Sequence, residues 1–299
     1  MADAIRVEGL VKTYGERTAV RSVSFAVRTG EVLGLLGPNG AGKTTTVEIL
    51  EGLRARSAGA VEVLGRDPAQ GGRWLRNRLG VVLQNAAIDG QLSVTEVVRL
   101  YGSFYRRPRP VRELLALVGL SDASRVKVAA LSGGQRRRAD LALALVGNPE
   151  ILFLDEPTTG FDPAARRRAW DVIAGLRGLG VTILLTSHYL DEVEHLADRV
   201  VVLRAGTVVA EGRPSELRSA ASAESTVTFR CFDPAALPAG PWRELASAEP
   251  HRRSLVTSRP TEALAVLSRW AIARGIELEE LEVRRPSLED VYLALTGEG

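Results

Sequence analysis

Residues 37–45, Gly-Pro-Asn-Gly-Ala-Gly-Lys-Thr-Thr, form the stretch that decides the fold of this 299-residue chain. They match the pattern G-x-x-x-x-G-K-[ST], follow an apolar run at 31–36 that predicts a buried strand, and open a helix-like stretch at 43–52. Glycines let such a loop wrap phosphate groups closely, and the N–H groups at the helix start add positive potential. We therefore predict a phosphate-binding loop with these members: Gly37, Pro38, Asn39, Gly40, Ala41, Gly42, Lys43, Thr44 and Thr45.

Within this loop two side chains have specific expected roles. Lys43 is one of only three lysines in the chain and is expected to reach the β- and γ-phosphates of a nucleotide. The hydroxyl of Thr44 is expected to bind Mg²⁺.

A second motif supplies two carboxylates. The apolar run at 151–154 predicts a central strand, and Asp155 and Glu156 follow at its carboxyl end, the edge at which open α/β sheets bind ligands. Asp155 is expected to bind Mg²⁺ through water, and Glu156 to orient or deprotonate an attacking water. A plain acidic loop after a strand is the alternative, which the phosphate-binding loop upstream disfavours.

Strands and helices alternate along the chain after the phosphate-binding loop. Further strands are predicted at 79–83, 181–185 and 199–203, with helices between them, and the helical spacing at 93–119 indicates a helical insertion spanning about 86–145. This alternation predicts an α/β fold with a mostly parallel sheet.

The amino-acid composition changes near residue 220, where an Ala- and Ser-rich stretch ends. We predict a nucleotide-binding domain at 1–219 and a small α+β domain at 220–299. The second domain is expected to contain an amphipathic helix at Thr261–Arg274 and a final helix that starts with the capping pair Ser287 and Asp290.

Composition excludes several classes of protein. Lysine and arginine number 39 against 36 acids, a net charge of +3, so no nucleic-acid partner is expected. The single cysteine, Cys231, permits no internal disulfide. No secretory signal is visible, and the apolar runs are far shorter than the roughly 18–20 residues that span a bilayer. We expect the chain not to cross a membrane.

The segment Leu131-Ser-Gly-Gly-Gln135 resembles the signature sequence of ATP-binding cassette (ABC) ATPases. The motifs occur in the order of that family over about the first 215 residues. The resemblance implies a P-loop NTPase cassette that binds ATP and Mg²⁺. Its parts are a RecA-like core with a mostly parallel sheet, an antiparallel β subdomain and a helical subdomain.

The resemblance also implies roles for residues outside the two nucleotide motifs. Tyr14 is similar to the aromatic residue that stacks on adenine, and Gln84 to the glutamine that senses Mg²⁺ and water. His188 is similar to the histidine that contacts the γ-phosphate, and Asp162 to the acid of a loop between subunits. The signature residues expected to contact the nucleotide held by a second subunit are Ser132, Gly133, Gly134 and Gln135. Phe161 stands where leucine is common in the family.

Because the chain has one copy of each motif, the resemblance implies a homodimer of cassettes arranged head to tail with two nucleotides between them. The segments 84–89, 187–192 and 286–297 resemble the daunorubicin-resistance type of ABC exporter ATPase. That group implies export of a drug, antibiotic or lipid-like compound through a separate permease of about six helices, with this chain peripheral on the cytoplasmic face of the membrane. The alternative is a soluble single-cassette ATPase that acts as a switch on a non-membrane assembly partner.

Two arginine triplets lie at predicted helix starts, Arg136–Arg138 and Arg166–Arg168. We interpret both as solvated helix faces. For the first triplet, a contact with nucleotide or permease is the alternative.

Overall fold

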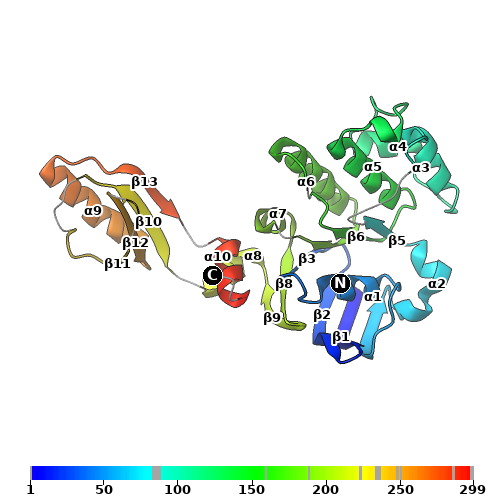
Figure 1. The fold of residues 1–299 in the computed structure, drawn as a ribbon, viewed down its shortest axis with the longest axis horizontal. Coiled ribbons are helices and arrows are strands. Elements are labelled where there is room, and N and C mark those ends of the chain that lie inside the picture. Colours follow the sequence, from blue (N-terminus) through cyan, green and yellow to red (C-terminus); the bar gives the residue numbers. More distant parts are fainter. Residues whose placement is uncertain are drawn as a thin grey trace. The chain divides into compact units, whose positions relative to one another are not determined.

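The computed structural model divides the chain into two compact units, Met1–Pro214 and Ser215–Gly299 (Figure 1). The structure describes residues 2–82, 89–158, 160–187, 189–221, 224–232, 237–246, 249, 251–284 and 287–296. Gln84 and His188 lie outside the described residues.

A six-stranded sheet forms the centre of the first unit. Its strands, in spatial order, are β5 (Leu79–Val82), β6 (Ile151–Asp155), β7 (Thr182–Thr186), β3 (Val32–Leu36), β8 (Arg199–Arg204) and β9 (Thr207–Gly212). The first five run parallel and β9 runs antiparallel to β8. Every residue of β3 and β7 is buried, as expected for strands covered on both faces. The predicted α/β fold with a mostly parallel sheet is confirmed.

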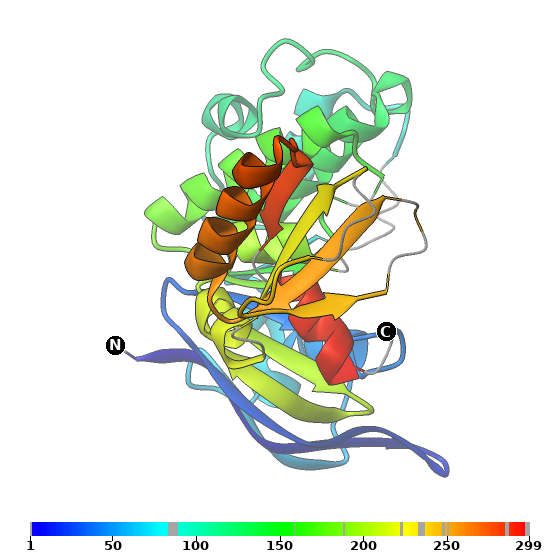
Figure 2. The same ribbon diagram turned by 90° about the vertical axis from the view of Figure 1, so that its left-hand side faces the viewer.

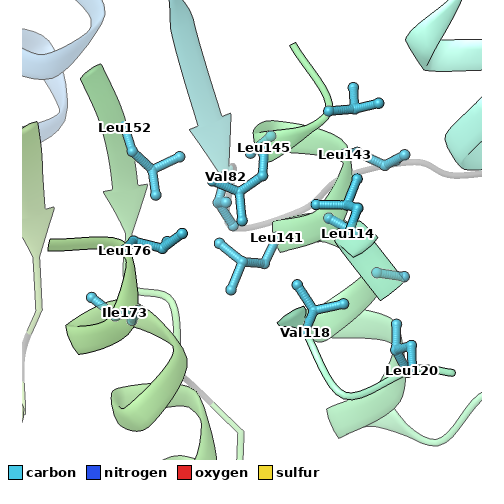
Figure 3. Packing of buried hydrophobic residues seen from close by; sticks show 14 of the residues in the cluster. Val82, Leu114, Val118, Leu120, Leu141, Leu143, Leu145, Leu152, Ile173 and Leu176 are labelled. Atoms are coloured by element: carbon cyan, nitrogen blue, oxygen red, sulfur yellow. The ribbon is translucent and has the colours of Figure 1, made fainter. Parts of the chain in front are cut away.

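Five helices share a core with one face of this sheet. They are α3 (Val94–Gly102), α4 (Val111–Leu117), α5 (Gly133–Leu145), α6 (Pro163–Gly178) and α7 (Leu190–Leu196). Two of them, α3 and α4, pack against α5. Leu152 and Leu154 of β6 pack into a core built with the first four of these helices and the end of α7 (Figure 3). The alternate residues Ile151 and Phe153 pack into a second core with helix α1 (Lys43–Leu50). Because both faces of β6 are covered, its carboxyl end at Asp155 is the part that reaches solvent.

A three-stranded antiparallel sheet lies against the second core. Its order is β2 (Arg17–Arg28), β1 (Asp3–Tyr14) and β4 (Ala58–Val63). Side chains from β1 and β2 join α1 in this core, so the antiparallel sheet and the parallel sheet sandwich α1. Helix α2 (Pro68–Arg76) follows β4.

The helical region between β5 and β6 has two similar helix starts. Ser93 caps α3 through a reciprocal pair of hydrogen bonds with Glu96, and Ser132 caps α5 in the same way with Gln135. Pro110 directly precedes α4, and a short 3-10 turn, η1 (Val128–Ala130), precedes the signature segment.

The second unit contains a four-stranded antiparallel sheet in the order β11 (Arg243–Leu245), β12 (Arg252–Thr257), β10 (Ser225–Arg230), β13 (Glu279–Arg284). Helix α9 (Pro260–Arg274) lies on one face of it (Figure 2), where Leu267 packs against Phe229 and Leu255. The remaining helices of this part are α8 (Pro214–Ala221) and α10 (Leu288–Thr296). The predicted small α+β fold is confirmed, and Ser287 and Asp290 cap α10 as expected.

Candidate functional site

The loop from Gly37 to Gly42 joins β3 to α1 and has a backbone that only glycine suits at key points. Gly42, the N-cap of α1, has φ +101°, and a Cβ there would lie 2.7 Å from the carbonyl oxygen of Ala19. The ammonium of Lys43 donates hydrogen bonds to the carbonyl oxygens of Gly37 and Pro38, the latter at 3.2 Å. Lys43 therefore lies back across the loop, next to the first N–H groups of α1, which helix geometry leaves without intrahelical acceptors.

An open cleft of about 590 Å³ lies over this loop. It joins the loop to the end of β1, the start of β2 and the carboxyl end of β6. The predicted site residues that line it are Tyr14, Asn39, Gly40, Gly42, Lys43, Thr44, Thr45, Asp155 and Glu156. The other loop members, Gly37, Pro38 and Ala41, do not line the cleft. Two carbonyls of the loop hold Lys43, and Ala41 is buried.

Two arginines, Arg17 and Arg54, also line the cleft and were not predicted as site residues. The guanidinium of Arg54 lies 5.3 Å from the ring centre of Tyr14, and the ammonium of Lys12 lies 4.9 Å from the same ring. Tyr14 is 39% exposed, so the ring remains accessible from the cleft. The sequence offers one signal for these two arginines: basic residues lie near Tyr14, at Lys12 and Arg17, and shortly after α1, at Arg54.

The two adjacent carboxylates are held differently. Asp155 accepts a hydrogen bond from the hydroxyl of Thr186 on the neighbouring strand β7. The N–H of Glu156 donates to the carbonyl oxygen of Thr186 at 3.0 Å, and Glu156 has φ +48°. A left-handed backbone at a residue other than glycine costs of order 1 kcal/mol and is concentrated at functional sites. Glu156 is thus aimed into the cleft at the expense of backbone strain.

Helix α5 also contacts this turn, through Arg137. Its guanidinium donates to the carbonyl oxygens of Asp155, Glu156 and Pro157 at 3.0 to 3.3 Å. The interpretation of Arg136–Arg138 as a solvated face is therefore wrong for Arg137, whose side chain is only 12% exposed. It is also wrong for Arg138, which donates to the carbonyl of Gly119 at 2.6 Å.

The second triplet needs the same correction at its first member. The guanidinium of Arg166 lies 3.9 Å from the ring centre of Tyr189, and its side chain is 21% exposed. Arg167 and Arg168 are exposed, as a solvated face requires. Arg137, Arg138 and Arg166 differ from the prediction because their guanidinium groups bind backbone carbonyls or an aromatic ring, and residue spacing reveals neither kind of acceptor.

The signature residues Ser132, Gly133, Gly134 and Gln135 start α5 and are absent from the described lining of the cleft. The Ser132 hydroxyl accepts from the N–H of Gln135 at 3.3 Å, and the Gln135 side chain accepts from the N–H of Ser132 at 3.0 Å. Ser132 and Gly133 are exposed. Asp162 is exposed as well and caps α6, accepting from the N–H of Ala165 at 2.8 Å.

Oxygen donors suited to Mg²⁺ are present in the cleft. The hydroxyl of Thr44, an exposed residue, and the carboxylate of Asp155 both face it. Among the described residues there is no group of three or more His, Cys, Asp and Glu side chains that could hold a metal alone. The donor set therefore fits an ion that takes its remaining ligands from phosphates and water.

Glu51, at the end of α1, is a buried carboxyl that the sequence did not single out. Burial raises its pKa to about 8, and the negative charges of Asp155 and Glu48 add to the effect. The only indication of its burial in the sequence is its position directly after an apolar turn of the helix.

No helix in the described part of the chain is both long and apolar enough to cross a bilayer.

Comparison with known proteins gives two family matches. A family model described as ABC transporter matches residues 20–159, and one described as ABC transporter domain-containing protein-like, C-terminal domain, matches residues 225–287.

Full-length relatives match as well. A daunorubicin resistance ATP-binding protein of Streptomyces coeruleorubidus is 42% identical, with 100% of this chain and 98% of that protein covered. A Nod factor export ATP-binding protein I of Rhizobium johnstonii is 37% identical, with 98% of this chain and 95% of that protein covered.

Among solved structures, an ATP-binding subunit of an ABC transporter superposes with a TM-score of 0.66 at 27% identity, covering 73% of this chain and 92% of that one. A dimeric ATP-binding cassette in a post-hydrolysis state, bound to ADP and Pi, superposes with a TM-score of 0.63 at 25% identity. It covers 70% of this chain and 98% of that one.

Proposed function

Because the chain belongs to the ATP-binding subunits of ABC transporters, we propose that it energises a separate membrane permease that exports a drug-like, antibiotic or lipid-like compound. The chain is an ATPase of that family. Full-length similarity to a daunorubicin resistance protein and to a Nod factor export protein supports export and the class of compound. The same similarity favours an exporter over a soluble switch on an assembly partner.

The observation that carries the ATPase site is the cleft where the loop with Lys43 meets Asp155 and Glu156. In our proposal, Lys43 and the first N–H groups of α1 bind the phosphates. Tyr14 stacks on the base, as the open ring at the rim of the cleft allows. Glu156 accepts a proton from, or orients, the water that attacks the terminal phosphate. Gln84 and His188 are proposed to complete the site next to the metal and the γ-phosphate.

Thr44 and Asp155 would hold Mg²⁺, which when bound neutralises negative charge on the phosphates. Thr186 holds Asp155 in place for that task, since its hydroxyl donates to one carboxylate oxygen and leaves the other available.

The assembly is proposed to be a head-to-tail dimer. Ser132, Gly133, Gly134 and Gln135 lie outside the cleft of their own chain, which is what contact with a partner's nucleotide requires. A solved cassette of the same fold is dimeric with ADP and Pi bound, which supports this arrangement. Asp162, exposed at the start of α6, is proposed to face the partner subunit.

We assign residues 1–219 to the nucleotide-binding domain and 220–299 to an accessory domain, with the C-terminal family match at 225–287 in support. The partner is proposed to be a permease of about six helices, encoded separately, with this chain bound to it at the cytoplasmic face of the membrane.

The substitution Glu156→Gln tests the site. We expect kcat for ATP hydrolysis to fall by about a hundredfold or more, because a general base typically accelerates the reaction by about 10²–10⁴-fold. The variant should also accumulate as an ATP-loaded dimer in size-exclusion chromatography. Glu113→Gln, at an exposed position of α4, is the control and should leave both properties unchanged. A Glu156→Gln variant that stays monomeric with ATP and hydrolyses at the normal rate rejects the assigned role.

Co-purification from native membranes tests the partner. We expect a multi-spanning protein to accompany the chain through detergent extraction and affinity purification. If no such protein is recovered, and the chain leaves the membranes without urea or alkali, the permease proposal is wrong.

A further inference from the structure

The side chain of Arg137 joins the signature helix to the turn that contains Glu156. Arg137 lies on α5, two residues after Gln135. Its Nε donates to the carbonyl oxygen of Pro157 at 3.2 Å, and its Nη2 donates to those of Asp155 at 3.3 Å and Glu156 at 3.0 Å. Three consecutive carbonyl groups of one turn therefore bind one guanidinium.

The chemistry of arginine suits this arrangement. A guanidinium has five N–H donors in a planar fork and stays charged at any ordinary pH, whereas a lysine has one nitrogen. The third guanidinium nitrogen, Nη1, lies 3.9 Å from the carboxylate of Asp140, one helical turn along α5. Asp140 is 8% exposed, so the charge of Arg137 has a nearby counter-charge in a mostly buried setting.

The contacts of Arg137 surround the residue with the unusual backbone. Glu156 has φ +48°, and its N–H is fixed separately by the carbonyl of Thr186 on β7. With the carbonyl groups before, at and after Glu156 bound to Arg137, the backbone of the turn has little freedom, and this sets the direction in which the side chain of Glu156 leaves it. A strained conformation of this kind persists only where the surroundings over-determine it.

We propose that Arg137 is a positioning residue for Glu156, and that it transmits the position of the signature helix to that carboxylate within one subunit. This inference rests on the proposed function, because it takes Glu156 to act on the attacking water. The start of α5 would meet the nucleotide held by the partner, and Arg137 lies within the next turn of the same helix. When the signature helix binds the nucleotide held by the partner, Arg137 would then orient the Glu156 carboxylate at the nucleotide held by its own chain.

The test compares steady-state ATP hydrolysis by the full-length chain with that of the variants Arg137→Met and Arg137→Lys. We expect Arg137→Met to lower kcat by about tenfold to a hundredfold, the usual effect of removing a side chain that orients a reacting group. The KM for ATP should stay within about twofold, because Arg137 does not line the cleft. Arg137→Lys can donate to fewer of the carbonyls, so its kcat should lie between those of Arg137→Met and the wild type.

Two further variants complete the design. Arg168→Met removes an exposed arginine from α6 and should behave as the wild type. If Arg137→Met fails to fold because Asp140 loses its counter-charge, the double variant Arg137→Met with Asp140→Leu removes both charges and takes its place.

A double-mutant cycle separates positioning from general stability. If Arg137 acts through Glu156, adding Arg137→Met to Glu156→Gln should not lower the residual single-turnover rate further. If instead the two substitutions lower the single-turnover rate independently, so that their fold-losses multiply in the double variant, the inference is overturned. So would a kcat for Arg137→Met within twofold of the wild type, or a KM that rises in step with the loss of kcat. Wild-type hydrolysis by Glu156→Gln alone would instead reject the proposed function.

Discussion

The buried carboxylate of Glu192 accepts a hydrogen bond of 2.8 Å from the hydroxyl of Thr158, 34 positions earlier in the chain. The same oxygen accepts from the indole N–H of Trp170 at 3.1 Å. Glu192 is on α7 and Trp170 on α6, whereas Thr158 lies two residues after Glu156. The turn next to the cleft is thus bound to α7 through Glu192, which Trp170 of α6 also holds, and to α5 through Arg137.

Removal of the Glu192 carboxylate should destabilise the cassette. Glu192→Ala leaves the buried Thr158 hydroxyl and the partly buried Trp170 N–H without this acceptor, so we expect the free energy of unfolding to fall by about 2–3 kcal/mol. Glu192→Gln keeps one acceptor oxygen and should lose less. Urea denaturation measures both, with the exposed Glu16→Ala as control. Equal midpoints for the Ala, Gln and wild-type chains would contradict the prediction.

Glu51 should make stability depend on pH. Its folded-state pKa of about 8 lies above the 4.5 of an unperturbed glutamate, so the folded chain holds a proton that the unfolded chain releases. The stability associated with this proton is complete below about pH 4.5 and is lost as pH rises through about 8. Glu51→Gln should therefore be more stable than the wild type at pH 8.5, by about 5 kcal/mol at roughly 1.4 kcal/mol per pKa unit.

The gap between Glu51→Gln and the wild type should close toward pH 5. Urea midpoints at the two pH values, without nucleotide or Mg²⁺, check this, and Glu62→Gln on the exposed face of β4 is the control. A gap that is the same at both pH values would show that packing, and not the proton, separates the two chains.

Lys43 should dominate the affinity for nucleotide. Its ammonium is already at the loop, bound to the carbonyls of Gly37 and Pro38, and a charge-assisted hydrogen bond contributes about 1.5–3 kcal/mol. We expect Lys43→Met to weaken ATP binding by about tenfold to a hundredfold, as measured by titration of a fluorescent ATP analogue. Lys127→Met, at an exposed position, is the control. Equal affinities for the two variants would exclude Lys43 from phosphate binding.

Comparison of Ser93 with Ser132 should distinguish the effect of losing a helix cap from the effect of losing a contact with nucleotide. Ser93 and Ser132 make the same reciprocal hydrogen bonds at the starts of α3 and α5. Each Ser→Ala change should cost about 1 kcal/mol of stability. In the Glu156→Gln background, only Ser132→Ala should also weaken the ATP-dependent dimer in sedimentation experiments. If Ser93→Ala weakens it equally, the effect comes from the helical region and not from a contact of Ser132.

Much of the fold could be predicted because short-range patterns determine it. The apolar run before Gly37 gave β3, and the capping pair of Ser287 and Asp290 marked the start of α10, because both depend on neighbours in sequence. The residues of the cleft were also found, since glycine spacing and adjacent carboxylates are local patterns. Arg17 and Arg54 were missed because their place in the cleft depends on how two sheets pack around α1.

The contacts that fix the turn after β6 could not be read in the same way. Arg137 binds carbonyl oxygens, which every residue has, so no side-chain pattern marks its acceptors. Glu192 looks like an ordinary polar residue of an amphipathic helix, and its burial arises only when Thr158 and Trp170 come together from distant segments. Long-range contacts of this kind leave no periodic trace in the sequence.

The choice of main-chain acceptors by Arg137 also affects how variation at this turn can be interpreted. The oxygens of Asp155, Glu156 and Pro157 keep their identity whatever side chains replace those three residues. A library of substitutions at position 156 therefore varies the reacting group while the guanidinium that holds the turn keeps its partners. Residues at position 156 that tolerate its left-handed backbone should therefore leave this attachment intact, whereas replacement of Arg137 removes all three hydrogen bonds at once.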